Sequence, residues 1–133
     1  GDALFHLNNQ LEIVNQVPAG IHGLCNASLN TSWPKLDHLK RHFKASIDKK
    51  FDKEALLDLM LDKQLAEEEW LPETGITREM ERALSSIFID LPTYGTRSTT
   101  LITIDNHGVA DLTEITHHPK QTGNRKHFNF KIL

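Results

Sequence analysis

The chain of 133 residues has the length of one ordinary domain, and its 38% hydrophobic and 25% charged residues are typical of a folded globular protein. Its 15 basic and 18 acidic side chains leave a net charge of −3. Because this balance produces no broad cationic field, nucleic acid and anionic membranes are not expected partners. The sequence has no apolar run long enough to span a membrane. Its one cysteine, Cys25, excludes an intrachain disulfide and favours a reducing compartment, so we expect a cytoplasmic protein.

The beginning of the chain predicts short β-strands. Apolar residues mark two candidate strands at residues 3–7 and 11–17, and the Asn8-Asn9 pair between them is typical of a hairpin turn, because Asn tolerates positive φ. A turn at residues 18–20 then leads into residues 21–26. For this segment we expect a third short strand that ends at a functional bend.

The middle of the chain predicts three helices. The first begins near Pro34, and its apolar residues recur at spacings of three and four to form one stripe: Leu36, Leu39, Phe43 and Ile47. The second begins near Asp52 and extends to about Lys63. The third follows Thr77 as N-cap and runs from residue 78 to about 88, with inward-facing Met80, Leu84 and Ile87. Between them, the acidic residues 67–69 indicate a solvated surface, and residues 71–75 indicate a loop.

The last third of the chain returns to β-structure. We predict strands at residues 99–105 and 109–117 around an Asn-His-Gly turn, then a polar loop at 119–125 and a final strand at 127–133. Strands, then helices, then strands indicate an α+β fold with an antiparallel sheet. Such a sheet would keep open edges and an uncovered face, so the sequence predicts one half of a larger layered structure.

Four stretches of the chain resemble the NRDE family, also called the transport-and-Golgi-organisation family. They are Gly1-Asp2, Gly-Leu-Cys-Asn at 23–26 with Trp-Pro-Lys at 33–35, Leu-Pro-Glu-Thr-Gly at 71–75, and Tyr-Gly-Thr-Arg-Ser at 94–98. Their order and spacing agree with the family over essentially all 133 residues. One departure is Cys25, where the family usually has Ser. Family members are about twice as long and begin with Met-Cys, soon followed by Asn-Arg-Asp-Glu, and neither feature is present here.

The resemblance implies both a fold and a chemistry. The family is similar to N-terminal-nucleophile (Ntn) hydrolases, whose fold is a four-layer αββα sandwich. Residues 1–133 would therefore form the C-terminal half of one such domain, and the N-terminal half of the same protein would be its partner. In Ntn chemistry the thiol of an N-terminal Cys attacks an amide carbonyl, and its own α-amine, with an ordinary pKa of about 8, serves as the base. That nucleophile would belong to the other half.

Two residues of this half are candidate catalytic residues. In similar hydrolases, Asn at the position of Asn26 supplies a side-chain amide to the oxyanion hole, and a neutral N–H suits a developing O⁻. Asn26 could equally cap a turn before Ala27. Arg97, at a loop-to-strand junction, would hold the nucleophile's thiolate or a substrate carboxylate by paired hydrogen bonds. Its alternative role is a surface salt bridge. Tyr94 and Trp33 are candidate substrate-binding residues, although aromatic side chains near Gly and Pro often serve packing.

Other chemistry has less support in the sequence. A dyad of Cys25 with His22 is not expected, because residues three apart on a strand point to opposite faces, so Cys25 is interpreted as a small buried side chain. His117-His118 lacks matching ligands for a metal. No phosphate-binding loop or Gly-x-Ser-x-Gly motif appears, so we expect neither a cofactor nor a metal.

Two functions stay open at this point. The first is an Ntn-type amide hydrolase or acyltransferase of unknown substrate, in which this half supplies the oxyanion-hole and anion-holding residues. The alternative is a non-enzymatic protein that binds a small hydrophobic ligand or supports trafficking. The partners implied are the N-terminal half and a small acyl amide or hydrophobic ligand.

Overall fold

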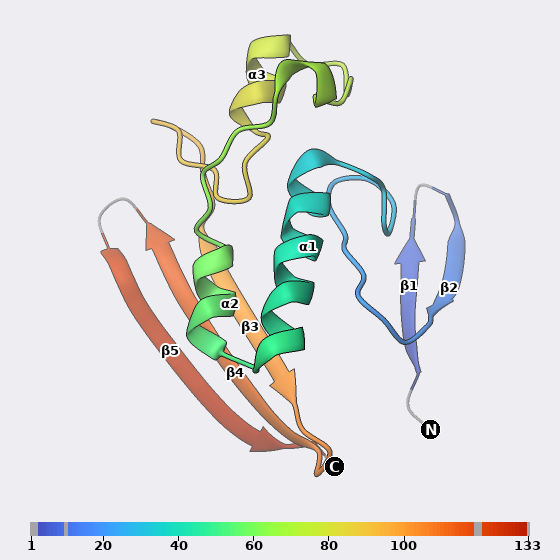
Figure 1. Ribbon diagram of the computed structural model, residues 1–133, viewed down its shortest axis with the longest axis vertical. Coiled ribbons are helices and arrows are strands. Elements are labelled where there is room, and N and C mark those ends of the chain that lie inside the picture. The colour runs from blue at the N-terminus through green and yellow to red at the C-terminus, as the bar shows by residue number, and fades with distance from the viewer. Residues whose placement is uncertain (1–2, 10, 119–120, 133) are drawn as a thin grey trace.

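The computed structural model describes residues 3–9, 11–118 and 121–132. These residues form an α+β structure with two antiparallel sheets (Figure 1). The first sheet is a hairpin of β1 (Leu4–Asn8) and β2 (Ile13–Val17). The second has the order β3 (Ser98–Ile104), β4 (Val109–His118) and β5 (Gln121–Lys131). Between the sheets along the chain lie α1 (Pro34–Lys49), α2 (Lys53–Leu59), the 3-10 turn η1 (Glu68–Trp70) and α3 (Arg78–Ala83). The predicted α+β class with antiparallel sheets is confirmed.

Helices α1 and α2 lie over one face of the three-stranded sheet, here called the inner face (Figure 1). Pro34 occupies the first turn of α1, and the Asp52 side chain caps α2 by accepting from the backbone N–H groups of residues 54 and 55. Leu36 of α1 and Leu56 and Leu57 of α2 are buried, and Thr99 of β3 is buried opposite them. The core therefore lies between these two helices and the inner face.

The opposite, outer face of the three-stranded sheet is apolar and uncovered. The register places Ile102 beside Leu112 and Leu112 beside Phe128 across the three strands, and it places Ile104, Ala110 and Phe130 in a second such row. The large side chains of the two outer strands are at least half exposed, with 56% for Ile102 and 53% for Phe128, while Leu112 on the central strand is half-buried. Contiguous apolar surface of this kind is typical of a face that packs against another element.

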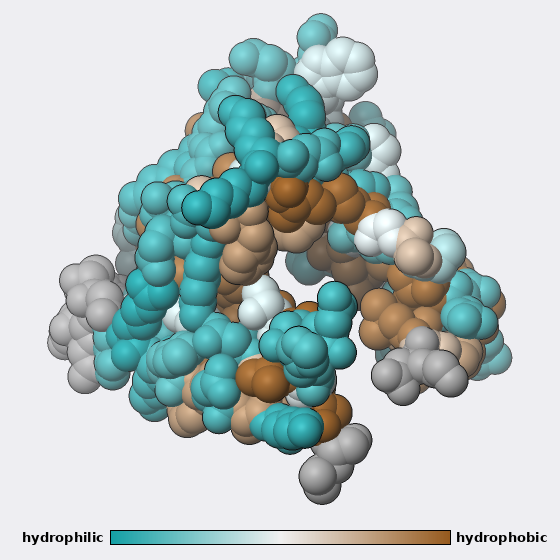
Figure 2. Space-filling model, turned by 60° about the horizontal axis from the view of Figure 1, so that its bottom comes forward, coloured by the Kyte–Doolittle hydropathy of each residue, from teal (hydrophilic) through white to brown (hydrophobic). Residues whose placement is uncertain are grey.

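The β1–β2 hairpin lies to the side of α1 (Figure 1). Asn8 accepts a hydrogen bond from the Leu11 backbone N–H at 3.0 Å, and the left-handed residue of the turn is Glu12, with φ of 52°. Leu4, Leu7 and Val14 are more than 60% exposed. Figure 2 shows hydrophobic surface on this hairpin, at the right of the view, and a gap between it and the rest of the molecule. Since a two-stranded hairpin is marginal on its own, further packing is expected there.

One predicted strand is absent, and three predicted ends of elements are wrong. Residues 21–26 form no strand. The Gly23 carbonyl accepts a hydrogen bond from the Asn30 backbone N–H, and the Gly23 N–H donates to the Asn30 side chain, so these groups do not pair with a neighbouring strand. Helix α2 ends at Leu59, short of Lys63, where Met60 N–H bonds the carbonyl of Leu57 and tightens the last turn. Helix α3 ends at Ala83 rather than near residue 88. Strand β5 already begins at Gln121, inside the predicted polar loop, of which residues 119–120 lie outside the described residues.

The early end of α3 has a local cause. The Ser85 hydroxyl donates to the Arg82 carbonyl at 2.7 Å and accepts from the Ala66 backbone N–H at 2.9 Å, so it replaces the next helical hydrogen bond. Leu84 and Ile87 are half-buried, but Met80 is 42% exposed, which contradicts its predicted inward position. The predicted Thr77 N-cap is confirmed, since its hydroxyl accepts from the Met80 backbone N–H. No helix within the described ranges is long and apolar enough to cross a membrane.

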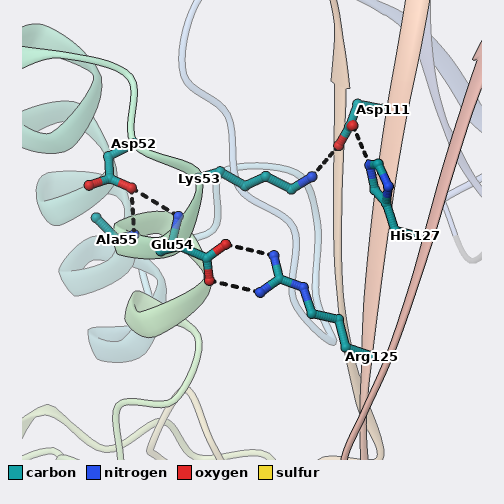
Figure 3. A network of polar contacts seen from close by, with 7 residues as sticks. All are labelled: Asp52, Lys53, Glu54, Ala55, Asp111, Arg125 and His127. Atoms are coloured by element: carbon teal, nitrogen blue, oxygen red, sulfur yellow. Dashed lines mark hydrogen bonds and ion pairs between the residues drawn. The ribbon is translucent and has the colours of Figure 1, made fainter.

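A polar network joins α2 to the inner face of the sheet (Figure 3). The Arg125 guanidinium donates to both carboxylate oxygens of Glu54, at 2.9 and 2.6 Å. Lys53 donates to Asp111, and Nε2 of His127 lies 2.5 Å from the other Asp111 oxygen. These contacts also explain why a polar segment forms a strand: its inward side chains bind the helix above it.

The network predicts an acid-sensitive contribution to stability. Hydrogen bonds from Lys53 and then from His127 lower the pKa of Asp111 from 3.8 to about 2. Because the pKa is lower in the folded state, the carboxylate stabilises the fold above its ordinary pKa, and this contribution is lost as the pH falls toward about 2. We expect Asp111→Asn to lower the free energy of unfolding at about pH 6 and to lower it much less at about pH 2.5, measured by urea unfolding. Asp58→Asn, which changes an exposed carboxylate on helix α2 outside the network, is the control. An equal effect of Asp111→Asn at both pH values would contradict the role of this network.

Candidate functional site

A cavity of about 160 Å³ lies where three of the stretches quoted above converge, and we call it the Asn26 cavity. The loop at 23–26 contributes Asn26, and the start of α1 contributes Trp33, Pro34 and Lys35. The other walls come from the 71–75 loop, helix α3 with the residues after it, and the 94–98 segment: Pro72, Thr74, Ile76, Glu81, Leu84, Ser85, Ile89 and Tyr94. The fourth stretch, Gly1-Asp2, lies outside the described residues.

Buried Glu81 fixes the 71–75 wall of the cavity. One of its carboxylate oxygens, Oε1, accepts from the Thr74 backbone N–H at 2.7 Å and from the Thr74 hydroxyl at 2.6 Å. These two hydrogen bonds lower the pKa of Glu81, and the nearby charges of Arg78 and Lys35 lower it further. Arg78 also donates to the Leu71 carbonyl at 3.1 Å. The loop is thus tied to α3 at both ends by charge-assisted hydrogen bonds.

The 94–98 wall depends on a close backbone approach at Gly95. A Cβ placed on Gly95 would lie 2.7 Å from the Ile89 carbonyl oxygen, which already accepts from the Thr96 N–H at 2.8 Å. The Thr96 hydroxyl in turn accepts a hydrogen bond from the Ile89 backbone N–H at 2.9 Å. A side chain at Gly95 would therefore displace the backbone beside Tyr94.

Asn26 lies on the wall of the cavity with its side chain available. It is exposed, and within the described part of the chain its amide makes no hydrogen bond. The turn after it is held by other groups, since the Thr31 backbone N–H and hydroxyl both bond the Ser28 carbonyl. The Asn26 N–H groups are therefore free to donate to a bound molecule, which is what an oxyanion hole requires.

The aromatic candidates differ in their surroundings. Trp33 is half-buried at the start of α1, and its ring lies 5.7 Å from the Lys35 ammonium. Tyr94 is 60% exposed and lines both the Asn26 cavity and a neighbouring depression. Together they give the Asn26 cavity two aromatic lining residues.

Arg97 is not part of the Asn26 cavity. It lines the neighbouring depression of about 380 Å³, along with Tyr94, Lys63, Phe88 and His117. It is exposed and forms no ion pair within the described residues, while its carbonyl accepts from the His117 N–H at 2.8 Å. The structure thus brings Asn26, Trp33 and Tyr94 together and places Arg97 beyond Tyr94. Tyr94 is the residue that lines both cavities.

His22 and Cys25 lie in a loop and not in the expected strand, and Cys25 is half-buried, not buried as expected. His22 bonds the Pro18 carbonyl through Nε2 and the Asn30 amide through Nδ1, both at 2.9 Å. Both ring nitrogens are therefore occupied away from Cys25, which is a half-buried free thiol. The ring of His117 binds Thr99 at 2.9 Å, and the side chain of His118 lies outside the described residues. In the described part of the chain, no group of three or more His, Cys, Asp or Glu is placed to hold a metal ion.

The sequence interpretation assigned no role to Lys35 or Glu81. Lys35 is part of the Trp-Pro-Lys stretch, whereas Glu81 lies outside all four family-like stretches. The position of Lys35, a charged residue inside a specific motif, could have indicated a functional role. For Glu81 no such signal existed, because a Glu on a short exposed helix is normally solvated.

The fold and the site define a class of protein: an α+β layer structure with one uncovered sheet face and a small motif-lined cavity. The family model described as "Transport and Golgi organisation 2" matches residues 1–119, and the chain belongs to this family. It is 31% identical over 126 residues to the human "Transport and Golgi organization protein 2 homolog" and 32% identical over 124 residues to the bovine one. Each alignment covers 86% of this chain and 45% of the relative. The chain therefore spans less than half of the length of these relatives.

Proposed function

We propose that residues 1–133 are the C-terminal half of an Ntn-type domain that hydrolyses or transfers an acyl amide. In this proposal the N-terminal half supplies a Cys nucleophile, and the present half supplies the oxyanion donor and the wall that binds substrate. The observation that carries the proposal is the unpaired Asn26 amide in the cavity where the family-like stretches converge. Because the chain contains one free cysteine, we also propose a reducing, cytoplasmic location.

The apolar outer face supports the division into two halves. An αββα sandwich packs two sheets face to face and leaves the helices outside. Here α1 and α2 cover the inner face, while Ile102 and Phe128 on the outer face remain more than half exposed. The relatives have more than enough additional chain to supply a second sheet, since this chain covers 45% of their length. The proposed occupant of the outer face is therefore the N-terminal half of the same protein.

The proposed reaction follows ordinary nucleophilic catalysis. The thiol sulfur of the N-terminal Cys attacks the amide carbonyl carbon, and its proton passes to the α-amine. The carbonyl oxygen gains negative charge and accepts a hydrogen bond from the Asn26 amide. The C–N bond then breaks, and the leaving amine takes the proton. Water hydrolyses the thioester, or a second acceptor takes the acyl group. Trp33 and Tyr94 would line the apolar part of the substrate, and Arg97 would bind a carboxylate or the thiolate from its neighbouring depression.

A covalent trap tests the proposal. The complete polypeptide, with its leading Met removed, is incubated with a panel of electrophilic acyl amides and analysed by intact mass and peptide mapping. We expect an acyl adduct on the N-terminal Cys. A matched preparation that retains the leading Met lacks the free α-amine and should form little adduct. The absence of an adduct across a varied panel, together with tight binding of an apolar ligand, would exclude the hydrolase.

The alternative function, binding of a small hydrophobic ligand without chemistry, is favoured by a second cavity. A volume of about 220 Å³ lies between α1, α2 and β3, and most of its lining is apolar, including Leu39, Phe43, Leu56, Met60 and Leu101. Cavities of this composition are typical of apolar ligand sites. The same mass analysis separates the two functions, because a carrier would bind its ligand reversibly and leave the protein mass unchanged.

A further inference from the structure

Lys35 is the one ammonium group that lines the Asn26 cavity. It lies in the first turn of α1 and is half-buried. Its Nζ donates to the Leu84 backbone carbonyl at 2.9 Å, and the face of Trp33 lies 5.7 Å away. The side chain is therefore held in place by a neutral acceptor and an aromatic ring.

No carboxylate within the described residues forms an ion pair with Lys35. Glu81 shares the cavity, but its Oε1 is bound twice by Thr74 and its charge also interacts with Arg78. Burial lowers the pKa of Lys35, against smaller opposite effects of Cys25 and Glu81. A cation that is removed from water without an opposite charge in contact is incompletely compensated. The Lys35 ammonium, which among the described residues contacts a neutral carbonyl and no carboxylate, can therefore donate to an anionic group in the cavity.

The remaining lining indicates the rest of the ligand. Trp33 and Tyr94 line it with aromatic side chains, and Pro34, Ile76 and Ile89 add aliphatic ones. A volume of about 160 Å³ restricts the occupant to a small molecule. Aromatic and proline side chains favour a flat apolar body over a polar one.

We propose that Lys35 is the anion-binding residue of the Asn26 cavity, and that the cavity takes a small monocarboxylate with a flat apolar body. The inference concerns the same cavity as the proposed function and names a substrate or product class for it: an acid, or an acyl amide that carries a carboxylate. It assigns the nearer cation to Lys35, on the cavity wall, instead of to Arg97 in the neighbouring depression.

A pair of isosteric probes tests the proposal in the complete polypeptide. Benzoate and benzamide have the same shape and differ in charge, so their binding is compared by titration calorimetry and by the chemical shift of the Trp33 indole N–H. We expect benzoate to bind roughly tenfold or more tighter than benzamide, because a charge-assisted hydrogen bond is made only by the acid. Lys35→Met should abolish this preference, and Lys35→Arg should retain most of it. Lys44→Met, which removes an exposed ammonium from the same helix, should leave the preference unchanged.

Three results would overturn the proposal. They are equal binding of the two probes by the unsubstituted protein, no binding of either, and an unchanged preference in Lys35→Met. If Lys35→Met fails to fold, as judged by thermal unfolding, Lys35→Gln and the comparison of the probes on the unsubstituted protein decide the matter. The assay needs no nucleophile. A protein that prefers benzoate through Lys35 but forms no acyl adduct would therefore retain this site and lose the hydrolase function.

Discussion

Replacing Asn26 by alanine is expected to lower the turnover of an acyl amide by a factor of about a hundred to a thousand, with little change in substrate affinity. The loss of one oxyanion-hole donor costs on the order of 3 kcal/mol of transition-state stabilisation. Because the Asn26 amide makes no hydrogen bond in the described part of the chain, its removal should not unfold the loop. The effect should therefore appear in kcat rather than in KM or Tm. Steady-state kinetics on the complete polypeptide, with an acyl amide that forms the covalent adduct, provide the measurement.

Two further variants define the role of the amide. Asn26→Asp keeps the shape of the side chain but replaces its N–H donors with a negative charge, so it should be at least as inactive as Asn26→Ala. Asn106→Ala changes an exposed asparagine in the β3–β4 turn and should leave turnover unchanged. If Asn26→Ala and Arg97→Ala both leave turnover and ligand binding unchanged, the assignment of the site to these residues is wrong.

Local patterns predicted the elements well where local physics decides them. The stripe through Leu36 predicted α1, the Thr77 cap predicted the start of α3, and the Asn-His-Gly turn predicted the β3–β4 hairpin. The start of α2 was predicted near Asp52, which the structure shows to be its N-cap. In that turn Gly108 has φ of 74°, and the Asp105 side chain accepts from two backbone N–H groups. Each feature depends on residues within a few positions of one another.

Contacts that are distant in sequence decided the rest. Strand β5 extends into a polar segment for two reasons. Arg125 binds Glu54, which lies 71 positions earlier, and the backbone of the segment pairs with β4. Residues 21–26 resemble a strand by composition, yet the Asn30 side chain binds Gly23 and fixes a loop instead. Helix α3 ends early because the Ser85 hydroxyl also accepts a hydrogen bond from the Ala66 backbone N–H. No periodicity in the sequence contains this information.

Only part of the candidate site could be predicted, because its residues come from segments that are distant in sequence. The resemblance named Asn26, Trp33, Tyr94 and Arg97, and three of these four line one cavity. Arg97 instead lines the neighbouring depression, and the spacing of the motif residues does not contain this separation. Lys35 was overlooked because a lysine near a helix start is ordinarily solvated, whereas here it is half-buried and its Nζ donates to the Leu84 carbonyl, 49 positions later.

Replacing Phe128 by aspartate is expected to destabilise the complete polypeptide by about 3 kcal/mol or more, although the side chain is 53% exposed here. The reason is that its row on the outer face, with Ile102 and Leu112, would be buried against the second sheet of a sandwich. Phe51, also 53% exposed, precedes α2 away from this face and is the matched control. Phe51→Asp should change the free energy of unfolding by less than about 1 kcal/mol. Urea unfolding of both variants measures the difference. Equal and small effects would show that solvent covers the outer face, and the chain would then need no second half to complete its fold.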